Sequence, residues 1–242
     1  WMAAARWPWS GWTGRRRLSP VPRSSRRVKK RPIRPGASGR ARVGATPREP
    51  AEPPAAREAV ERPGIPWVLP SPNMPTPDTA LVYPGMCLLE GTNLSEGRGT
   101  TRPFEMFGAP FIHPGTLVKV LREHRLPGVV FRPISFQPTF QKHAGKLCGG
   151  AQIHVADRAR FKPFLTGVAI LKAVHNTWPR DFAWKQPPYE YEEIKMPIDI
   201  LAGSERLRKD IESWKDLRDM EVWWTDELKA FEKIRRHYLL YK

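Results

Sequence analysis

The composition of this 242-residue chain changes abruptly near residue 63, and the change decides which part can build a core. Residues 1–63 contain no Asp, Asn, Gln, His, Phe, Tyr or Cys and consist largely of Arg, Pro, Ala, Gly, Ser and Trp. Because few apolar residues recur there at helix or strand spacing, this segment cannot form a packed core, and we expect it to be disordered. Residues 64–242 are about 180 residues, which is enough for one domain with its own core.

The net charge of +17 also belongs mainly to the first quarter of the chain. Residues 1–62 hold 16 Lys and Arg against 4 Glu, and the remaining residues hold 25 against 20 acidic residues. Three interpretations compete: a phosphate-neutralising arm, a disordered linker, or an out-of-frame translation of a G/C-rich gene. We favour the third, since every abundant residue in the segment has G/C-rich codons, and we rank nucleic-acid binding last.

Other function classes find little support in the sequence. No apolar run reaches the length of a membrane span, and no signal peptide is present in this chain. Two cysteines, Cys87 and Cys148, are too few for a disulfide framework or a zinc site, and the six histidines show no metal-ligand spacing. We therefore expect neither a metal nor another cofactor.

The first half of residues 64–242 mixes helical and strand patterns. Thr76-Pro77-Asp78 is typical of a helix start, and Pro84-Gly85 should end that helix. The apolar run Met86–Leu89 predicts a buried strand that delivers Glu90 at its end. Thr116–Arg125 predicts a helix. Residues 129–140 predict a strand that lies at an edge or contains bulges, because they include Pro133 and Pro138.

The second half adds one strand and three helices. Residues 151–157 alternate as a strand, and residues 164–175 carry a helical stripe. Ser204 and Thr225 each predict the start of a further helix. These elements together predict an α+β fold, with strands and helices mixed in one C-terminal domain.

The stretch EGTNLSEGRGTTRPFE, residues 90–105, is the most informative candidate for a functional site. Its glycines allow a ligand to approach the backbone closely, and its arginines suit a carboxylate. Its other polar side chains suit hydroxyl and amide groups. The combination favours a polyhydroxylated ligand with an anionic group. The candidate substrate-binding residues are Asn73, Glu90, Asn93, Ser95, Glu96, Arg98, Thr100 and Arg102.

The same stretch has an alternative interpretation without a ligand. Glu–Arg pairs and turns formed by Asn, Ser and Thr can serve only to hold the shape of the loop. Residue types alone support the two interpretations about equally. Acid–base catalysis by Glu90 and Glu96 is the weaker hypothesis, because surface carboxylates are usually solvated or paired.

Three segments of the chain resemble the exo-β-N-acetylmuramidase family typified by NamZ. They are WVLPSPNMPTPDTALVYPGMCLLEGTNLSEGRGTTRPFEMFGAPFI (67–112), CGGAQIHVAD (148–157) and RRHYLLYK (235–242). The resemblance covers about residues 64–242. It implies a peptidoglycan-fragment glycoside hydrolase that releases N-acetylmuramic acid from non-reducing ends. Muramic-acid sugars carry hydroxyls, an amide and a lactyl carboxylate, and would be the partners of this domain.

The resemblance also implies a second domain whose motifs this sequence lacks. Family members carry an N-terminal Rossmann-like α/β domain with a Gly-Pro-Glu-His-Gly motif and an Asp-Arg-Pro-Asn-Pro motif, and neither motif occurs here. We therefore expect a truncated, inactive copy of an exported or periplasmic bacterial enzyme. The alternatives are a non-catalytic sugar-binding module and, with less support, a nucleic-acid binder.

Overall fold

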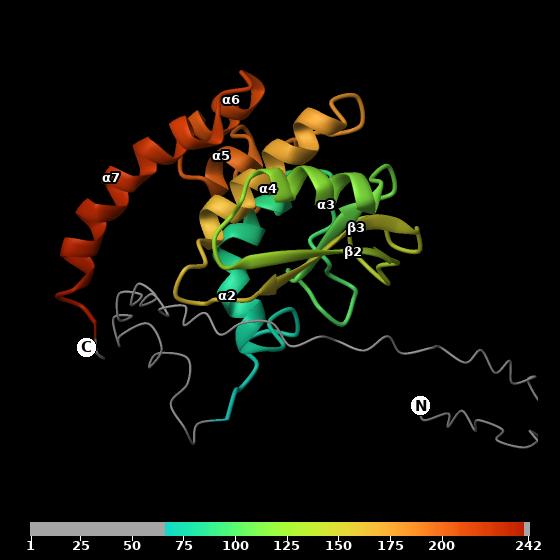
Figure 1. The fold of residues 1–242 in the computed structure, drawn as a ribbon, viewed down its shortest axis with the longest axis horizontal. Helices are drawn as coiled ribbons and strands as arrows, with labels where there is room; N and C mark the ends of the chain where they lie inside the picture. Colours follow the sequence, from blue (N-terminus) through green and yellow to red (C-terminus); the bar gives the residue numbers. More distant parts are fainter. Residues whose placement is uncertain (1–65, 240–242) are drawn as a thin grey trace, which may run out of the picture. The chain divides into compact units, whose positions relative to one another are not determined.

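The computed structural model describes residues 66–239, so the basic segment 1–63 lies outside the described residues. The α+β fold class is confirmed: a small antiparallel sheet packs against several helices (Figure 1). The sheet has the order β1-β3-β2, where β1 is Met106–Ala109, β2 is Val129–Phe136 and β3 is Cys148–Val155. Because β2 lies at an edge, Pro133 can sit within it without removing a hydrogen bond from a central strand.

Two helices form the centre of the core. Every residue of α4 (Pro163–Thr177) from Leu165 to Val174 is buried, so neighbours surround this helix on all sides. The helix α2 (Pro77–Met86) crosses it with almost no gap, since a Cβ atom added to Gly167 would lie 2.2 Å from the carbonyl oxygen of Gly85. The crossing therefore requires glycine at this contact.

A third helix, α3 (Pro114–Glu123), packs against both β2 and α4 through Leu117, Val118 and Leu121. The predicted helix at 116–125 is confirmed, but it begins two residues earlier. The reason is an N-cap that the sequence did not reveal: the His113 ring nitrogen Nδ1 accepts a hydrogen bond from the backbone N–H of Thr116. The expected strand at 151–157 is likewise confirmed and begins earlier, at the Cys148 end of β3.

The predicted strand at Met86–Leu89 is wrong. Met86 is the last residue of α2, and a 3₁₀ helix, η1 (Cys87–Gly91), follows directly. Pro84 lies inside α2 instead of ending it. A short apolar run cannot distinguish a buried strand from a buried helical turn, and both place Leu88 and Leu89 in the core.

The C-terminal helices also differ from the expected ones. They are α5 (Pro197–Leu201), α6 (Arg206–Glu212) and α7 (Leu217–Arg235). Ser204 caps no helix, because α6 begins after Glu205 and has no side-chain cap. The last helix begins at Leu217, where Asp216 accepts a hydrogen bond from Arg218, and not at Thr225.

Candidate functional site

The centre of the predicted stretch is a pair of glutamates bridged by one arginine. Glu90 is placed by η1, and Glu96 and Arg98 follow on the loop that leads to β1. Arg98 Nη2 lies 2.7 Å from Glu90 Oε1, and Arg98 Nε lies 3.1 Å from Glu96 Oε1. The guanidinium also stacks over the Phe104 ring, 5.1 Å from its centroid. One planar, two-sided donor therefore fixes the distance between two carboxylates.

Lys142 completes this cluster from a loop that the sequence did not single out. Its ammonium lies 3.1 Å from Glu96 Oε2 and donates to the carbonyl oxygens of Leu89, Glu90 and Leu94 at 2.9, 3.3 and 3.0 Å. Burial lowers the pKa of Lys142, and the carboxylate of Glu96 opposes that shift. Two carboxylates thus face two cations, and the cluster is balanced in charge.

Tyr189 approaches the second oxygen of Glu90 from a distant part of the chain. Its hydroxyl donates to Glu90 Oε2 at 3.1 Å. Burial raises the pKa of Tyr189, and the charge of Glu90 raises it further, so the phenol stays protonated as a donor. The side chain of Glu90 is 17% exposed and that of Glu96 is 4% exposed. Glu90 is therefore the carboxylate of this cluster that solvent and a ligand can reach.

A second polar cluster surrounds Glu105. Its Oε1 accepts from the hydroxyls of Thr76 and Thr79 at 3.1 and 2.6 Å, and its Oε2 lies 3.2 Å from Arg102 Nη1. Thr76 is also the N-cap of α2, so this cluster ties the loop to the start of that helix. The side chain of Arg102 is 45% exposed, against 25% for Arg98, which makes it the more accessible guanidinium.

Three predicted ligand residues direct their polar atoms to the protein itself. Asn93 donates to the Asp181 carbonyl at 2.7 Å and accepts from the Ala183 N–H at 3.1 Å. Ser95 accepts from the Gly97 N–H, and Thr100 donates to the Gly97 carbonyl. Hydrogen bonds that shape the loop are thus present at these positions.

Asn73 lies apart from these contacts. It is half-buried in a turn before α2, where its backbone N–H donates to Ser71 Oγ at 3.2 Å. Within residues 66–239 its side chain forms no hydrogen bond, so the amide remains available to a ligand. The sequence located the acidic and basic residues of the loop, but it missed Lys142 and Tyr189. No local pattern marks them, since they join the cluster only in three dimensions.

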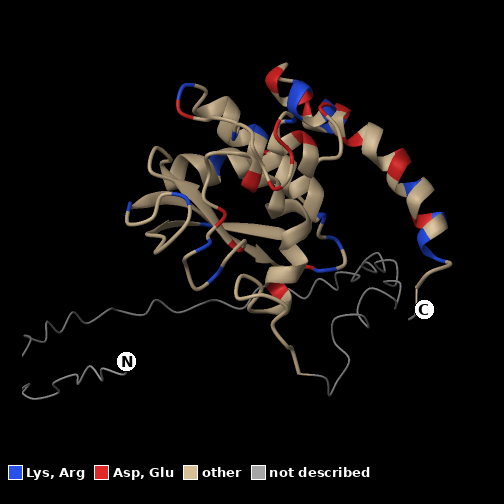
Figure 2. Cartoon of the chain, turned by 180° about the vertical axis from the view of Figure 1, so that it is seen from behind, with Lys and Arg blue, Asp and Glu red and all other residues tan. Residues whose placement is uncertain are grey.

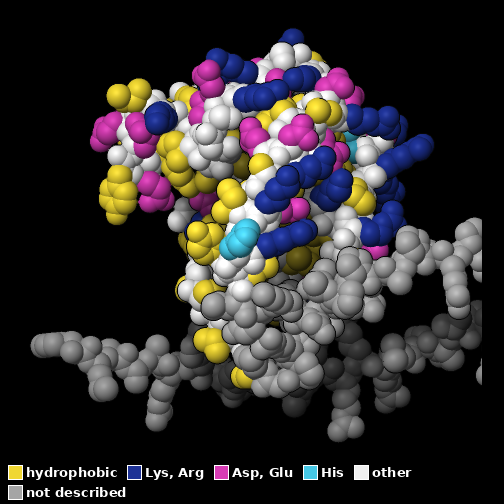
Figure 3. All heavy atoms as spheres, turned by 90° about the vertical axis from the view of Figure 1, so that its left-hand side faces the viewer, with side chains coloured by type: hydrophobic (Ala, Val, Ile, Leu, Met, Phe, Trp, Pro, Cys, Tyr) yellow, Lys and Arg dark blue, Asp and Glu magenta, His cyan; other side chains and the backbone are white. Residues whose placement is uncertain are grey.

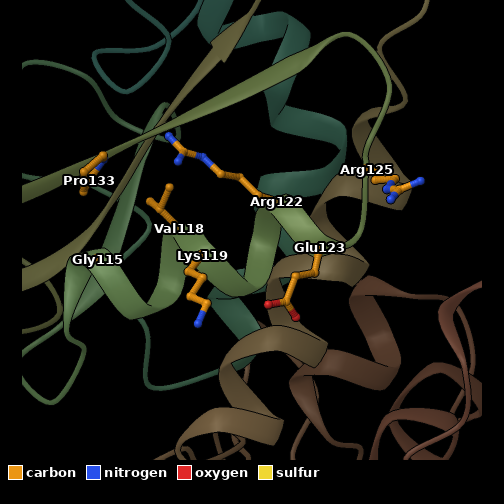
Figure 4. A pocket seen from close by; sticks show the side chains of 7 residues that line it. All are labelled: Gly115, Val118, Lys119, Arg122, Glu123, Arg125 and Pro133. Atoms are coloured by element: carbon orange, nitrogen blue, oxygen red, sulfur yellow. The ribbon is translucent and has the colours of Figure 1, made fainter.

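A separate pocket of about 480 Å³ lies between α3 and β2. Figure 4 shows Lys119, Arg122 and Glu123 leaving α3 in different directions, with Arg125 and Pro133 at the margins. None of the candidate residues lines it. Ligand sites usually hold a few polar groups that converge on one point, and these charged side chains do not converge.

Two further findings concern only the described part of the chain. Residues 66–239 contain no group of three or more His, Cys, Asp or Glu side chains that could hold a metal ion. Over the same residues, no helix is both long and apolar enough to cross a membrane.

Together these features define an α+β domain with a partly exposed cluster of charged side chains. We call Glu90, Glu96, Arg98 and Lys142 the acid–arginine cluster; its two carboxylates and two cations balance in charge. The chain belongs to the family described as exo-β-N-acetylmuramidase NamZ, C-terminal, whose model matches residues 81–241. The match includes the acid–arginine cluster and the helices α3 to α7.

Relatives of known sequence and structure agree with this assignment. The chain is 44% identical over 177 residues to the peptidoglycan β-N-acetylmuramidase NamZ of Bacillus subtilis (strain 168), which covers 73% of the chain and 41% of that protein. Two crystal structures of DUF1343 family proteins from Bacteroides fragilis NCTC 9343 are similar, each at 25% identity. Their TM-scores are 0.63 and 0.50, over 74% and 72% of this chain and 46% and 44% of theirs. The chain therefore spans less than half the length of these relatives.

Proposed function

We propose that this domain binds muramic-acid sugars derived from peptidoglycan through the cluster around Glu90. The observation that supports this most is the position of Glu90, whose carboxylate is oriented by Arg98 and Tyr189 and is still partly open to solvent. A carboxylate held in this way can accept hydrogen bonds from sugar hydroxyls. The Bacillus subtilis relative is named for acting on peptidoglycan, which agrees with such a ligand.

The lactyl carboxylate of muramic acid needs a cationic partner, and we assign this role to Arg102. Its guanidinium is the more exposed of the two in the loop, and a planar guanidinium suits a carboxylate. Glu105, which now pairs with Arg102, keeps the hydroxyls of Thr76 and Thr79 when Arg102 turns to a ligand. Glu105 therefore keeps two donors on Oε1 after the exchange, and only Oε2 gives up its partner.

For hydrolysis, we propose that this domain supplies one wall of the site and that further carboxylates come from the part of the family protein outside the match. Glycosidases usually need two carboxyl groups about 5–10 Å apart. Among the three glutamates of residues 90–105, Glu96 and Glu105 are almost completely buried, so Glu90 is the one that can face a substrate. By itself the chain should bind the sugar without cleaving it.

Calorimetric titration of the full chain tests the binding. We expect N-acetylmuramic acid to bind with a Kd of about 1 mM, and N-acetylglucosamine, which lacks the lactyl group, to bind at least fivefold more weakly. Arg102→Gln should remove this preference, whereas Lys119→Gln, at the separate pocket, should not change it. Equal affinity for the two sugars, or no saturable binding of either, contradicts the proposed ligand.

Release of a chromophore from a β-muramide tests the second half of the proposal. We expect the full chain to release it no faster than buffer. Turnover clearly above the buffer rate that is lost in Glu90→Gln would show that the chain carries its own catalytic carboxylates. The proposal that further carboxylates come from outside the match would then be wrong, while the proposed binding of the sugar would stand.

A further inference from the structure

The face of α7 that packs against the domain continues beyond the domain. Leu217 and Met220 at the start of the helix are buried. Three exposed apolar residues of α7 and one in the turn after it, which we call the α7 stripe, are between 53% and 79% exposed: Leu228, Phe231, Ile234 and Tyr238. Met220 and Phe231 are 11 residues apart, or about three helical turns, so both lie on the same face. Figure 1 shows α7 running away from α4 and the sheet.

The charges on α7 argue against two common kinds of surface helix. Leu217–Arg235 carries four basic and five acidic residues, so the helix is nearly neutral. Figure 2 shows both signs along its length. Helices that lie on anionic membranes or bind nucleic acid carry a strong excess of Lys and Arg, whereas in α7 as a whole the acidic residues outnumber the basic ones and a basic excess is confined to its last two turns. Figure 3, which views this side of the molecule, shows apolar side chains exposed between charged ones of both signs. The α7 stripe therefore suits a protein surface.

The size of the α7 stripe favours a covalently linked neighbour over a second copy of the chain. With about 150–250 Å² for a complete aromatic side chain, its four residues expose roughly 400–500 Å². A stable interface between separate proteins buries about 800 Å² on each partner. Domains within one chain form interfaces from about 600 Å² in total, because the linker raises their effective concentration.

The relatives extend well beyond the matched region. The matched family model describes a C-terminal region and extends to residue 241, so it includes the α7 stripe. In the Bacillus subtilis relative the match covers 41% of the protein, which leaves 59% outside it. We propose that the α7 stripe is the docking surface for the N-terminal part of a NamZ-family protein. This inference rests on the shape of α7 and does not depend on the proposed sugar ligand.

Co-expression provides the first test. The full 242-residue chain is produced together with a tagged N-terminal part of the Bacillus subtilis relative, and the two are purified through the tag. We expect equimolar recovery, reduced at least tenfold by Phe231→Asp. Val222→Asp is the matched control, because Val222 is 64% exposed and lies nine residues from Phe231, on the opposite face of the same helix. Recovery that Phe231→Asp leaves unchanged overturns the proposal.

Two further measurements test the proposal even if the N-terminal part of the relative does not fold by itself. In a chimera with this part fused before residue 66, hydrogen exchange of residues 226–239 should slow at least tenfold relative to the full chain. Unchanged exchange overturns the proposal. Sedimentation of the full chain should show a monomer, and a dimer that Phe231→Asp dissociates but Val222→Asp does not would assign the α7 stripe to a second copy instead.

Discussion

Replacing Lys142 by methionine tests whether this ammonium holds the candidate site together. The substitution keeps a long apolar stem and removes the charge and all the donors. Glu96 then loses one of its two cations, and three carbonyl oxygens between residues 89 and 94 lose a common donor. The segment between η1 and the loop that carries Arg98 should therefore loosen.

The structure sets the expected magnitude. A hydrogen bond to a charged group contributes about 1.5–3 kcal/mol, and breaking a buried ion pair from one side costs about 3–5 kcal/mol. The Lys142 side chain is 23% exposed, so water can enter the vacated space, and Arg98 still lies 3.1 Å from Glu96. We therefore expect the lower limit, a loss of about 3 kcal/mol in the free energy of unfolding. That is a large share of the total for a domain of this size, which is about 5–15 kcal/mol.

Urea unfolding followed by tryptophan fluorescence measures this loss. Trp184 is a suitable reporter, because its backbone forms a bridge with Thr92 inside the affected segment. Lys146→Met is the matched control: Lys146 lies in the same loop with its side chain exposed, and its substitution should change stability by less than about 0.5 kcal/mol. If Lys142→Met costs no more than Lys146→Met, the ammonium does not organise the site.

Three other substitutions examine the same region. Gly99→Ala should cost about 2 kcal/mol or more, because Gly99 has φ +80° and a Cβ atom there would lie 2.7 Å from the backbone of Phe140. Gly145→Ala is the control and should cost about 1 kcal/mol, because Gly145 has φ +72° but a Cβ atom there would meet nothing within 4 Å. If denaturant unfolding shows the same loss of stability for both variants, the close contact between residue 99 and Phe140 is contradicted. Tyr189→Phe should weaken the alkaline loss of stability. Since the folded pKa of Tyr189 is raised, its stabilisation is present below the ordinary value of 10.0 and is lost as pH rises above it. The denaturant concentration at the midpoint of unfolding, measured at several pH values on both sides of pH 10, should therefore fall less steeply with pH in the variant. If the variant and the unmodified chain give parallel curves, the contact with Glu90 is refuted.

Helix starts and edge strands were predictable from the sequence where a residue type has a single strong local preference. Thr76 followed by Pro77 marks the start of α2 because a hydroxyl caps the helix and proline fits its first position. Pro133 marks β2 as an edge strand for a similar reason. The errors arose where the choice depends on tertiary contacts. Met86 and its neighbours are buried either as helix or as strand, and the choice depends on tertiary packing, here against α4 and α5.

The residues of the candidate site also fall into two groups, those that the sequence could identify and those that depend on tertiary contacts. Sequence composition located its charged residues, since carboxylates and arginines rarely gather in one loop without pairing. It could not show that Lys142 and Tyr189 complete the cluster, because they are 46 and 99 residues away from the glutamates they contact. The same limit applies to Asn93, whose partners at Asp181 and Ala183 belong to a distant loop.

The contacts of the two arginines determine which of them can meet an anionic ligand. Arg98 bridges Glu90 and Glu96, and turning it outward would bring two carboxylates closer to mutual repulsion with only Lys142 to compensate. Arg102 holds a single carboxylate, and after its release two threonine hydroxyls still donate to Oε1 of that carboxylate, although Oε2 loses its partner. The rearrangement at Arg102 is therefore the less costly one. On our proposal, Arg98 keeps Glu90 in place, and Arg102 exchanges its partner for the carboxylate of the ligand.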